Sequence, residues 1–272
     1  RIGFKWWALI IAVVFVISEL VCVACVPERP VACDEKPGKI SDMFKALFKN
    51  DQAMTVVVSI ILVYTSLNIC GNLVLYFFRF DVGNEGAYSI FAAVAFAAQV
   101  LVMMVIPLLR KRFSKSQLFI SGFIIQIAGF AVILIMAFAK LYTPQSWYIL
   151  CLPGILIYLG YGMLNVIMTI FLSDSVDYGE VMNGTREESV IFSMQTFTVK
   201  LASGVAVFLA GLVVDWIHLD TAAAVQTQDT LDALRMWMTI PSVILLIVGI
   251  FVFKRFYKLD DTRMEEIKSK LN

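Results

Sequence analysis

The sequence has very few of the residues from which enzyme active sites are built. It contains one histidine, His218, and only 16% of its 272 residues are charged. The Cys22–Cys25 pair has the spacing of a redox or metal site, but no histidine or third ligand is close to it in the sequence. No Ser–His–Asp set and no group of metal ligands is recognisable. We therefore expect a protein that is not an enzyme and that has no metal or organic cofactor.

Apolar residues, in contrast, make up 60% of the chain and lie in long runs. A helix rises ~1.5 Å per residue, so about 20 apolar residues cross the hydrocarbon core of a bilayer. The runs are longer than barrel strands and apolar on all sides, which favours helices. We predict an all-α membrane protein with seven transmembrane helices, at Trp6–Val26, Ala53–Phe78, Ala87–Leu109, Leu118–Ala139, Trp147–Leu172, Val190–Ile217 and Met236–Phe253.

Basic residues are distributed unequally between the two sides of these spans. If the N-terminus lies outside, sixteen Lys and Arg fall on the inside and five on the outside. The positive-inside rule then predicts a cytoplasmic C-terminus. The formal net charge is only +1, and the basic residues are not interleaved with aromatics in one patch. We expect a multi-pass protein of the cytoplasmic (inner) membrane that contacts lipids and no nucleic acid.

The spacing of the spans is uneven, and it suggests a domain organisation. One span, a polar segment and six closely spaced spans are typical of the second half of a twelve-helix transporter that begins one helix early. We predict a last N-terminal-half helix at 1–26, a cytoplasmic linker at 27–52, a six-helix bundle at 53–256 and a cytoplasmic tail at 257–272. Apolar residues from Ile40 to Phe48 recur at helical spacing, which favours a short amphipathic helix over an unstructured linker. The N-terminal half of the same transporter is an expected partner.

Lys200 is the most informative polar residue inside a span, because a charge at mid-bilayer costs ~3 kcal/mol. At ~100° per residue, Ser193, Thr196, Lys200 and Ser203 share one helix face, which is expected to line a cavity or a helix interface. A structural ion pair with a neighbouring helix is the alternative. Gln195 lies about 100° around the helix from Thr196 and is off this stripe.

Two amides in other spans are further candidates. Asn68 either bonds to another helix or lines a polar path. Asn165 lies in a span that also contains Pro153, Gly160 and Gly162, which let a helix bend where a cavity forms. Close glycine packing between helices is the alternative reading of that span.

Charged residues crowd a predicted loop after the fifth span. They are Asp174, Asp177, Glu180, Arg186, Glu187 and Glu188. In a bundle that moves, such charges can form ion pairs that hold one conformation closed. A solvated loop without such a role is the alternative.

The segment from Asp174 to Lys200 resembles one known family. Three motifs are similar to the tenth–eleventh loop and eleventh helix of the glycoside–pentoside–hexuronide:cation symporters, the melibiose permease-like carriers of the major facilitator superfamily. The motifs are Asp174-Ser-Val-Asp177-Tyr-Gly-Glu180, Gly184-Thr-Arg186 and Ser193-Met-Gln195-Thr196-Phe-Thr-Val-Lys200. Weaker similarity to the seventh helix and to the loop after the eighth is carried by Asn68-Ile69, Gly71, Tyr76–Phe78 and Leu109–Phe113.

The resemblance implies that the chain forms helices 6–12 of a major-facilitator fold. It implies symport of a sugar, glycoside or hexuronide with Na⁺ or H⁺ by alternating access, the coupling ion being bound mainly by the N-terminal half. The expected substrate-binding residues are Lys200, Thr196, Gln195, Asn165 and Asn68. Lys200 is also expected to take part in cation coupling. Asn165 occupies a position at which melibiose-like members have an aromatic residue. The expected cytoplasmic gate is Asp174, Asp177, Glu180 and Arg186. The alternatives are a transporter-fold relative that carries a lipid or other amphiphile, and a seven-helix receptor.

Overall fold

The computed structural model describes residues 2–25, 48–184 and 188–271, and the chain forms two compact units, residues 1–39 and 40–272. The first unit contains one helix, α1 (Ile2–Cys25), whose segment Lys5–Cys25 is long and apolar enough to cross a membrane. The predicted amphipathic helix at Ile40–Phe48 lies almost entirely outside the described residues.

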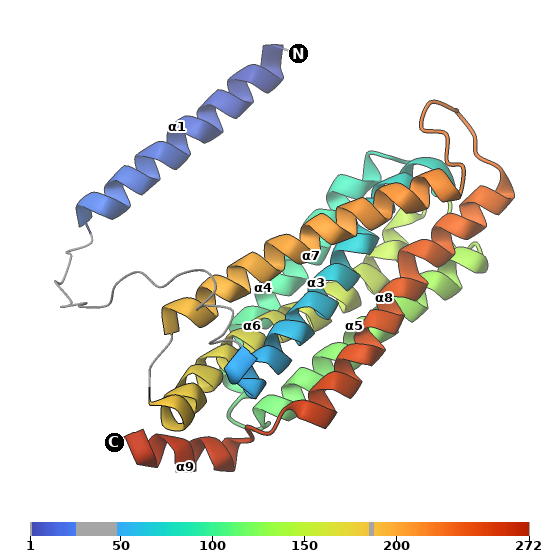
Figure 1. The fold of residues 1–272 in the computed structure, drawn as a ribbon. Helices are drawn as coiled ribbons and strands as arrows, with labels where there is room; N and C mark the ends of the chain where they lie inside the picture. The colour runs from blue at the N-terminus through green and yellow to red at the C-terminus, as the bar shows by residue number, and fades with distance from the viewer. Residues whose placement is uncertain (1, 26–47, 185–187, 272) are drawn as a thin grey trace. The chain divides into compact units, whose positions relative to one another are not determined.

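The second unit is a bundle of six long helices with a short helix at one end (Figure 1). Every described element is a helix, and seven helices, α1 included, are long and apolar enough to cross a membrane, so the predicted all-α class and number of spans are confirmed. The elements of this unit are α3 (Asp51–Tyr76), the π-helical turn η1 (Phe77–Asp81), α4 (Ala87–Leu109), α5 (Lys115–Phe138), the 3-10 turn η2 (Trp147–Leu150), α6 (Cys151–Asn183), α7 (Glu188–Trp216), α8 (Gln228–Phe256) and α9 (Asp261–Leu271).

Local capping explains where several helices begin. The Asn50 side chain accepts a hydrogen bond from the Ala53 N–H at the start of α3. Ser114 and Gln117 form a reciprocal capping box at the start of α5. Thr227 caps α8 by accepting from the Thr230 N–H, with Asp229 in the first turn.

Two helices are longer than hydropathy predicts. The prediction of a loop directly after Leu172 is wrong. Helix α6 continues to Asn183 and ends only at Gly184, which has φ +73°. The start predicted at Met236 is also wrong, because α8 begins at Gln228. The physical reason is the same in both places: hydropathy marks the apolar part of a helix, whereas the backbone stays helical where polar side chains find partners.

Helix α3 lies in the middle of the bundle, where it packs against α6, α7 and α8, while α5 packs against α6 and α8 (Figure 1). Glycines let α5 and α6 approach closely. A Cβ atom built on Gly160 would lie 2.5 Å from the carbonyl oxygen of Gly122, so any side chain there would push the helices apart. Phe119, Phe171 and Phe253 fill the space between α5, α6 and α8 near the end that carries α9.

The opposite end, which we call the far end, contains the loops at residues 82–86, 139–146 and 217–227. A buried ion pair joins η1 to α8 there. The Arg235 guanidinium donates from Nε and Nη2 to the two oxygens of Asp81, at 2.8 and 2.5 Å, and the two side chains are 2% and 4% exposed. Arg235 also donates to Asp232 and lies over the Phe138 ring.

Tyr142 completes this network from the 139–146 loop. Its hydroxyl donates to Asp81 at 2.7 Å. Burial raises the pKa of the Tyr142 phenol, and the hydrogen bond to Asp81 raises it further, so the hydroxyl stays protonated and remains a donor. The Asp81 carboxylate is therefore held by partners from two different segments, which fixes the far end of the bundle.

Removing only one partner of the buried pair should be strongly destabilising. We expect Arg235→Met to lower the free energy of unfolding by ~3–5 kcal/mol, because Asp81 would remain as an unpaired buried charge. The double variant Asp81→Leu/Arg235→Met should recover most of that loss, since no charge is then left behind. The exposed pair Arg79–Glu85, 3.7 Å apart, is the control, and Arg79→Met should change the value by less than ~1 kcal/mol. Thermal unfolding in detergent compares the stability of the unmodified protein with that of the three variants.

Glycine packing gives a second stability prediction. Gly160→Ala should destabilise the bundle by ~1–3 kcal/mol, because the added methyl group meets backbone atoms of α5 that cannot move independently. Gly204→Ala in α7 is the matched change, since nothing within 4 Å would meet its Cβ and the loss of a helical glycine is favourable. Equal effects of the two substitutions on the unfolding temperature would contradict the close α5–α6 contact.

Candidate functional site

The polar stripe of α7 lies on the surface of the six-helix unit. Ser193, Thr196 and Lys200 are exposed and Ser203 is half-buried. The opposite side of α7, which packs on α3, is built from Ile191, Met194, Thr198, Ala202, Ala206, Ala210 and Val213. Gln195 is half-buried and lies between these two faces. Within the described ranges the Lys200 side chain forms no ion pair or hydrogen bond, so its ammonium group is available to another molecule or chain segment.

The two candidate amides have different partners. Asn68 donates from Nδ2 to the backbone oxygen of Tyr64, one turn earlier in its own helix, at 2.7 Å. Asn165 donates from Nδ2 to the Tyr64 hydroxyl oxygen at 2.5 Å and so joins α6 to α3. Tyr64 is not among the residues that the sequence identifies as candidates. Its position four residues before Asn68, on the same helix face, is the signal that could have found it.

Asn165, Tyr64 and Lys200 occupy corresponding levels of their helices. Tyr64 is the 14th of 26 residues in α3, Asn165 the 15th of 33 in α6, and Lys200 the 13th of 29 in α7. Each therefore lies within about two residues of the middle of its helix, or ~3 Å of rise. All three polar groups therefore lie far from their helix ends, and Tyr64 and Asn165 also contact each other. A membrane is least able to solvate polar groups at such positions.

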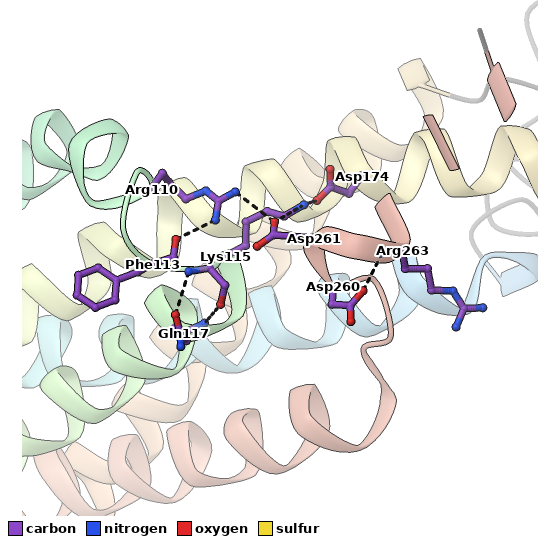
Figure 2. Close-up of polar contacts among 9 residues, drawn as sticks. Arg110, Phe113, Lys115, Gln117, Asp174, Asp260, Asp261 and Arg263 are labelled. Carbon is purple, nitrogen blue, oxygen red and sulfur yellow. Dashed lines mark hydrogen bonds and ion pairs between the residues drawn. The ribbon is translucent and has the colours of Figure 1, made fainter. Parts of the chain in front are cut away.

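Three of the charged residues predicted in the loop after the fifth span, Asp174, Asp177 and Glu180, lie on α6. Figure 2 shows Asp174 facing Lys115 from α5, and the two form an ion pair in which both side chains are 7% exposed. The Lys115 ammonium also lies 3.5 Å from Asp261 of α9, which in turn accepts from Arg110 at 3.2 Å. Burial alone would raise the pKa of Asp261, but the hydrogen bond from Arg110 and the charges of Arg110 and Lys115 lower it below its ordinary value.

Of the other three predicted gate residues, the structure describes Asp177 and Glu180. Asp177 and Glu180 are half-buried on α6, and both have partners. Arg186 lies outside the described residues. The prediction that Asp174 lies in a loop is wrong. Asp174 is a buried residue of α6, and its charge is balanced by Lys115. Lys115 and Asp261 could not be identified from the sequence, because their pairing depends on how α5, α6 and α9 pack.

The α9 end is further tied together by two amide side chains. Asn50 donates to the Ser175 backbone oxygen at 2.7 Å, next to Asp174. Gln52 accepts from the Lys258 N–H at 2.8 Å. Helix α9 itself packs Met264 and Ile267 against Tyr178 and Val181 of α6. The starts of α3 and α5, the end of α6 and the whole of α9 are therefore joined in one cluster.

Comparison with known proteins agrees with this geometry. Residues 1–261 match the family model described as MFS/sugar transport protein. The chain belongs to this family. It is 23% identical over 234 residues to the raffinose carrier protein of Pediococcus pentosaceus, covering 85% of this chain and 35% of that protein. It is 25% identical over 261 residues to the isoprimeverose transporter of Lactiplantibacillus pentosus, covering 95% of this chain and 52% of that protein. It is 24% identical over 276 residues to the lactose permease of Lactobacillus delbrueckii subsp. bulgaricus, covering 99% of this chain and 42% of that protein.

Membership in the MFS/sugar transport protein family confirms the predicted fold family and the resemblance on which it was based. Because the relatives are transporters, the chain is a multi-pass transporter-family protein and not an enzyme, and the receptor alternative is wrong. The chain spans about half the length of the first relatives it matches, since the matched region covers 54%, 35% and 52% of their respective lengths.

The attachment of α9 should depend on pH through Asp261. A carboxyl group whose pKa is lowered by folding stabilises the folded state above its ordinary pKa, about 3.9, and this contribution is lost as the pH falls through the lowered value. We therefore expect α9 to become accessible to protease as the pH drops below about 4. Asp261→Asn should be accessible already at neutral pH and should respond less to acid.

Asp260→Asn is the matched control for this experiment. The Asp260 side chain accepts from the Arg263 N–H at 2.8 Å, which an asparagine can reproduce, and it takes no part in the contacts to Arg110 and Lys115. Its pH profile should follow that of the unmodified protein. Identical profiles for Asp260→Asn and Asp261→Asn would refute the role of the ion pairs in holding α9.

Proposed function

We propose that the whole protein carries a sugar, glycoside or hexuronide across the cytoplasmic membrane together with Na⁺ or H⁺, and that this chain supplies its helices 6–12. The observation that carries the proposal is the exposed polar face at the middle of α7, with the charged Lys200 far from both ends of the helix. The names of the relatives, which include carriers of raffinose, isoprimeverose and lactose, support a sugar as the substrate.

An uncovered ammonium group at mid-helix is costly next to lipid, at ~3 kcal/mol. We infer that the N-terminal half of the transporter covers this face and that a watery substrate path lies between the halves. Support comes from the relatives, which are about twice as long as this chain. In this arrangement Lys200, Thr196 and Gln195 approach the sugar from α7, Asn165 from α6 and Asn68 from α3.

Coupling to a cation follows from charge. A bound Na⁺ or proton changes the electrostatic field at Lys200, and an ammonium group that exchanges partners can link ion binding to sugar binding. Thermodynamic linkage requires that an ion which tightens sugar binding is itself bound more tightly when the sugar is present. We propose that carboxylates of the N-terminal half bind the ion and that Lys200 transmits its presence to the sugar site.

Alternating access needs parts that move as rigid bodies and contacts that break. The Lys115–Asp174 pair and the contacts of α9 bind the elements of this half to one another, which suits a rigid body. Asp177, Glu180 and Arg186 remain as candidates for a cytoplasmic gate between the halves, and we place the C-terminus in the cytoplasm by the excess of basic residues on that side.

Lys200→Ala tests the proposal directly. We expect it to abolish uptake driven by a Na⁺ or H⁺ gradient into membrane vesicles, because the link between ion and sugar is removed. The amount of protein in the membrane should be unchanged, since Lys200 takes part in no described contact within its own half. The measurement is gradient-driven uptake of a panel of glycosides, pentosides and hexuronates.

Lys140→Ala is the control, because Lys140 is exposed in a far-end loop, donates only to Gln228 at 3.3 Å and should leave uptake at the unmodified rate. Uptake by Lys200→Ala at the same rate would show that this lysine has no part in transport. If the unmodified protein moved lipids or other amphiphiles but no sugar, the proposed substrate class would be wrong.

A further inference from the structure

A polar and aromatic cluster joins α3 to α6 near the middle of the bundle. Asn165 donates to the Tyr64 hydroxyl at 2.5 Å, and the Tyr64 ring meets the Tyr161 ring edge to face, with 5.5 Å between centroids and 77° between planes. Tyr158 extends the cluster, its ring 6.4 Å from that of Tyr161. Tyr64, Asn165 and Tyr158 are half-buried, so they are partly accessible from the surface of this half.

The hydrogen bonds of this cluster leave groups unused. Since the amide nitrogen of Asn165 can only donate, the Tyr64 oxygen is the acceptor, and the Tyr64 O–H still needs an acceptor. The Tyr161 ring, whose centroid lies 5.5 Å from that of Tyr64, brings a second phenol next to this pair. Two neighbouring phenols can satisfy at most one of their two O–H groups between them, so at least one phenol O–H and the Asn165 side-chain oxygen have no partner among the described residues.

A half-buried donor and acceptor side by side are expensive to leave unpaired in an apolar bundle. They suit a ligand group that both donates and accepts, and a hydroxyl is such a group. The cluster contains no charged side chain, which argues against a carboxylate or an ammonium group as its ligand. Adjacent aromatic rings provide apolar surface of the kind that binding sites place beside a few orienting polar groups.

We propose that Tyr64 and Asn165 form a subsite that recognises one hydroxyl group of an uncharged sugar ring, with Tyr64 donating to it and Asn165 accepting from it. The inference rests on the proposed function and adds a residue, Tyr64, and a task, selection by one hydroxyl. It gives the site two separate roles. Lys200 responds to the charge of the bound cation, and the Tyr64–Asn165 cluster recognises the position of one sugar hydroxyl. Tyr64, Asn165 and Lys200 each lie near the middle of their own helix, so neither role is assigned to a helix end.

The test uses the whole protein in membrane vesicles and a set of deoxy analogues of its transported sugar, each lacking one hydroxyl. Binding sites that hydrogen-bond a substrate hydroxyl discriminate strongly against analogues that lack it. We expect the unmodified protein to reject one deoxy analogue more strongly than the others. Tyr64→Phe keeps the ring and the contact with Tyr161 but removes the hydroxyl, so it should weaken selection at that one position by about tenfold or more in counterflow competition.

Asn165→Ala is the second variant and should relax selection at the same position, because both groups bind the same hydroxyl. Tyr178→Phe is the matched control: Tyr178 is also a half-buried tyrosine of α6, but it lies at the α9 end, where it packs with Met264 and Ile267, and its substitution should keep the original selection pattern. If Tyr64→Phe reduced uptake of all analogues in equal proportion, or left the pattern unchanged, Tyr64 would serve only to hold α3 against α6 and the subsite would be refuted.

The experiment also separates this inference from the function on which it rests. If the unmodified protein transported no sugar, the proposed function would fail and the subsite with it. Sugar uptake by the unmodified protein, combined with an unaltered pattern in both variants, would overturn the subsite alone.

Discussion

Charge that is removed from water must be paired, and this constraint organises the six-helix unit. Among the described residues, its two most buried basic side chains, Arg235 and Lys115, each face a carboxylate on another element, at opposite ends of the bundle. Separating either pair would leave a charge in an apolar environment, which costs several kcal/mol in effective terms. These pairs fix the helices that carry them to one another at the two ends, whereas the ammonium group of Lys200 near the middle of α7 has no such partner among the described residues.

This division between ends and middle fits what a carrier half requires. The connections at the α9 end run through Lys115, Asp174 and Asp261, and those at the far end through Asp81, Arg235 and Tyr142. Each set joins at least three separate segments of the chain. On the exposed side of α7, Lys200 makes no such contact among the described residues and Thr196 donates only within its own helix, so a substrate or a second half can bind these two side chains without competing with contacts that maintain the fold.

The sequence was a good guide to what depends on local composition. Long apolar runs identify the helices because the lipid requirement for satisfied backbone groups leaves few other structures. The periodicity around Lys200 distinguishes its face of α7 from the face packed on α3, because both lie on one helix of known geometry. That the polar face lines a cavity or an interface stays a prediction. The ends of α6 and α8 were missed because polar residues there are stabilised by other segments. Partners such as Lys115 for Asp174, and Tyr64 for Asn165, follow from tertiary packing that no single segment encodes.

The π-helical turn η1 has a consequence for comparing relatives. Its wider turn, closed by the Val82 N–H to the Phe77 oxygen at 3.0 Å, accommodates one more residue than an α-helical turn would. That extra residue sets the rotation at which the chain leaves α3, and so the direction in which Asp81 projects toward α8. A homologue shorter by one position in this segment would close an ordinary turn and bring a different side chain to Arg235. Alignments across Phe77–Asp81 should therefore be anchored on the acidic residue that meets the guanidinium, with any gap placed inside the turn.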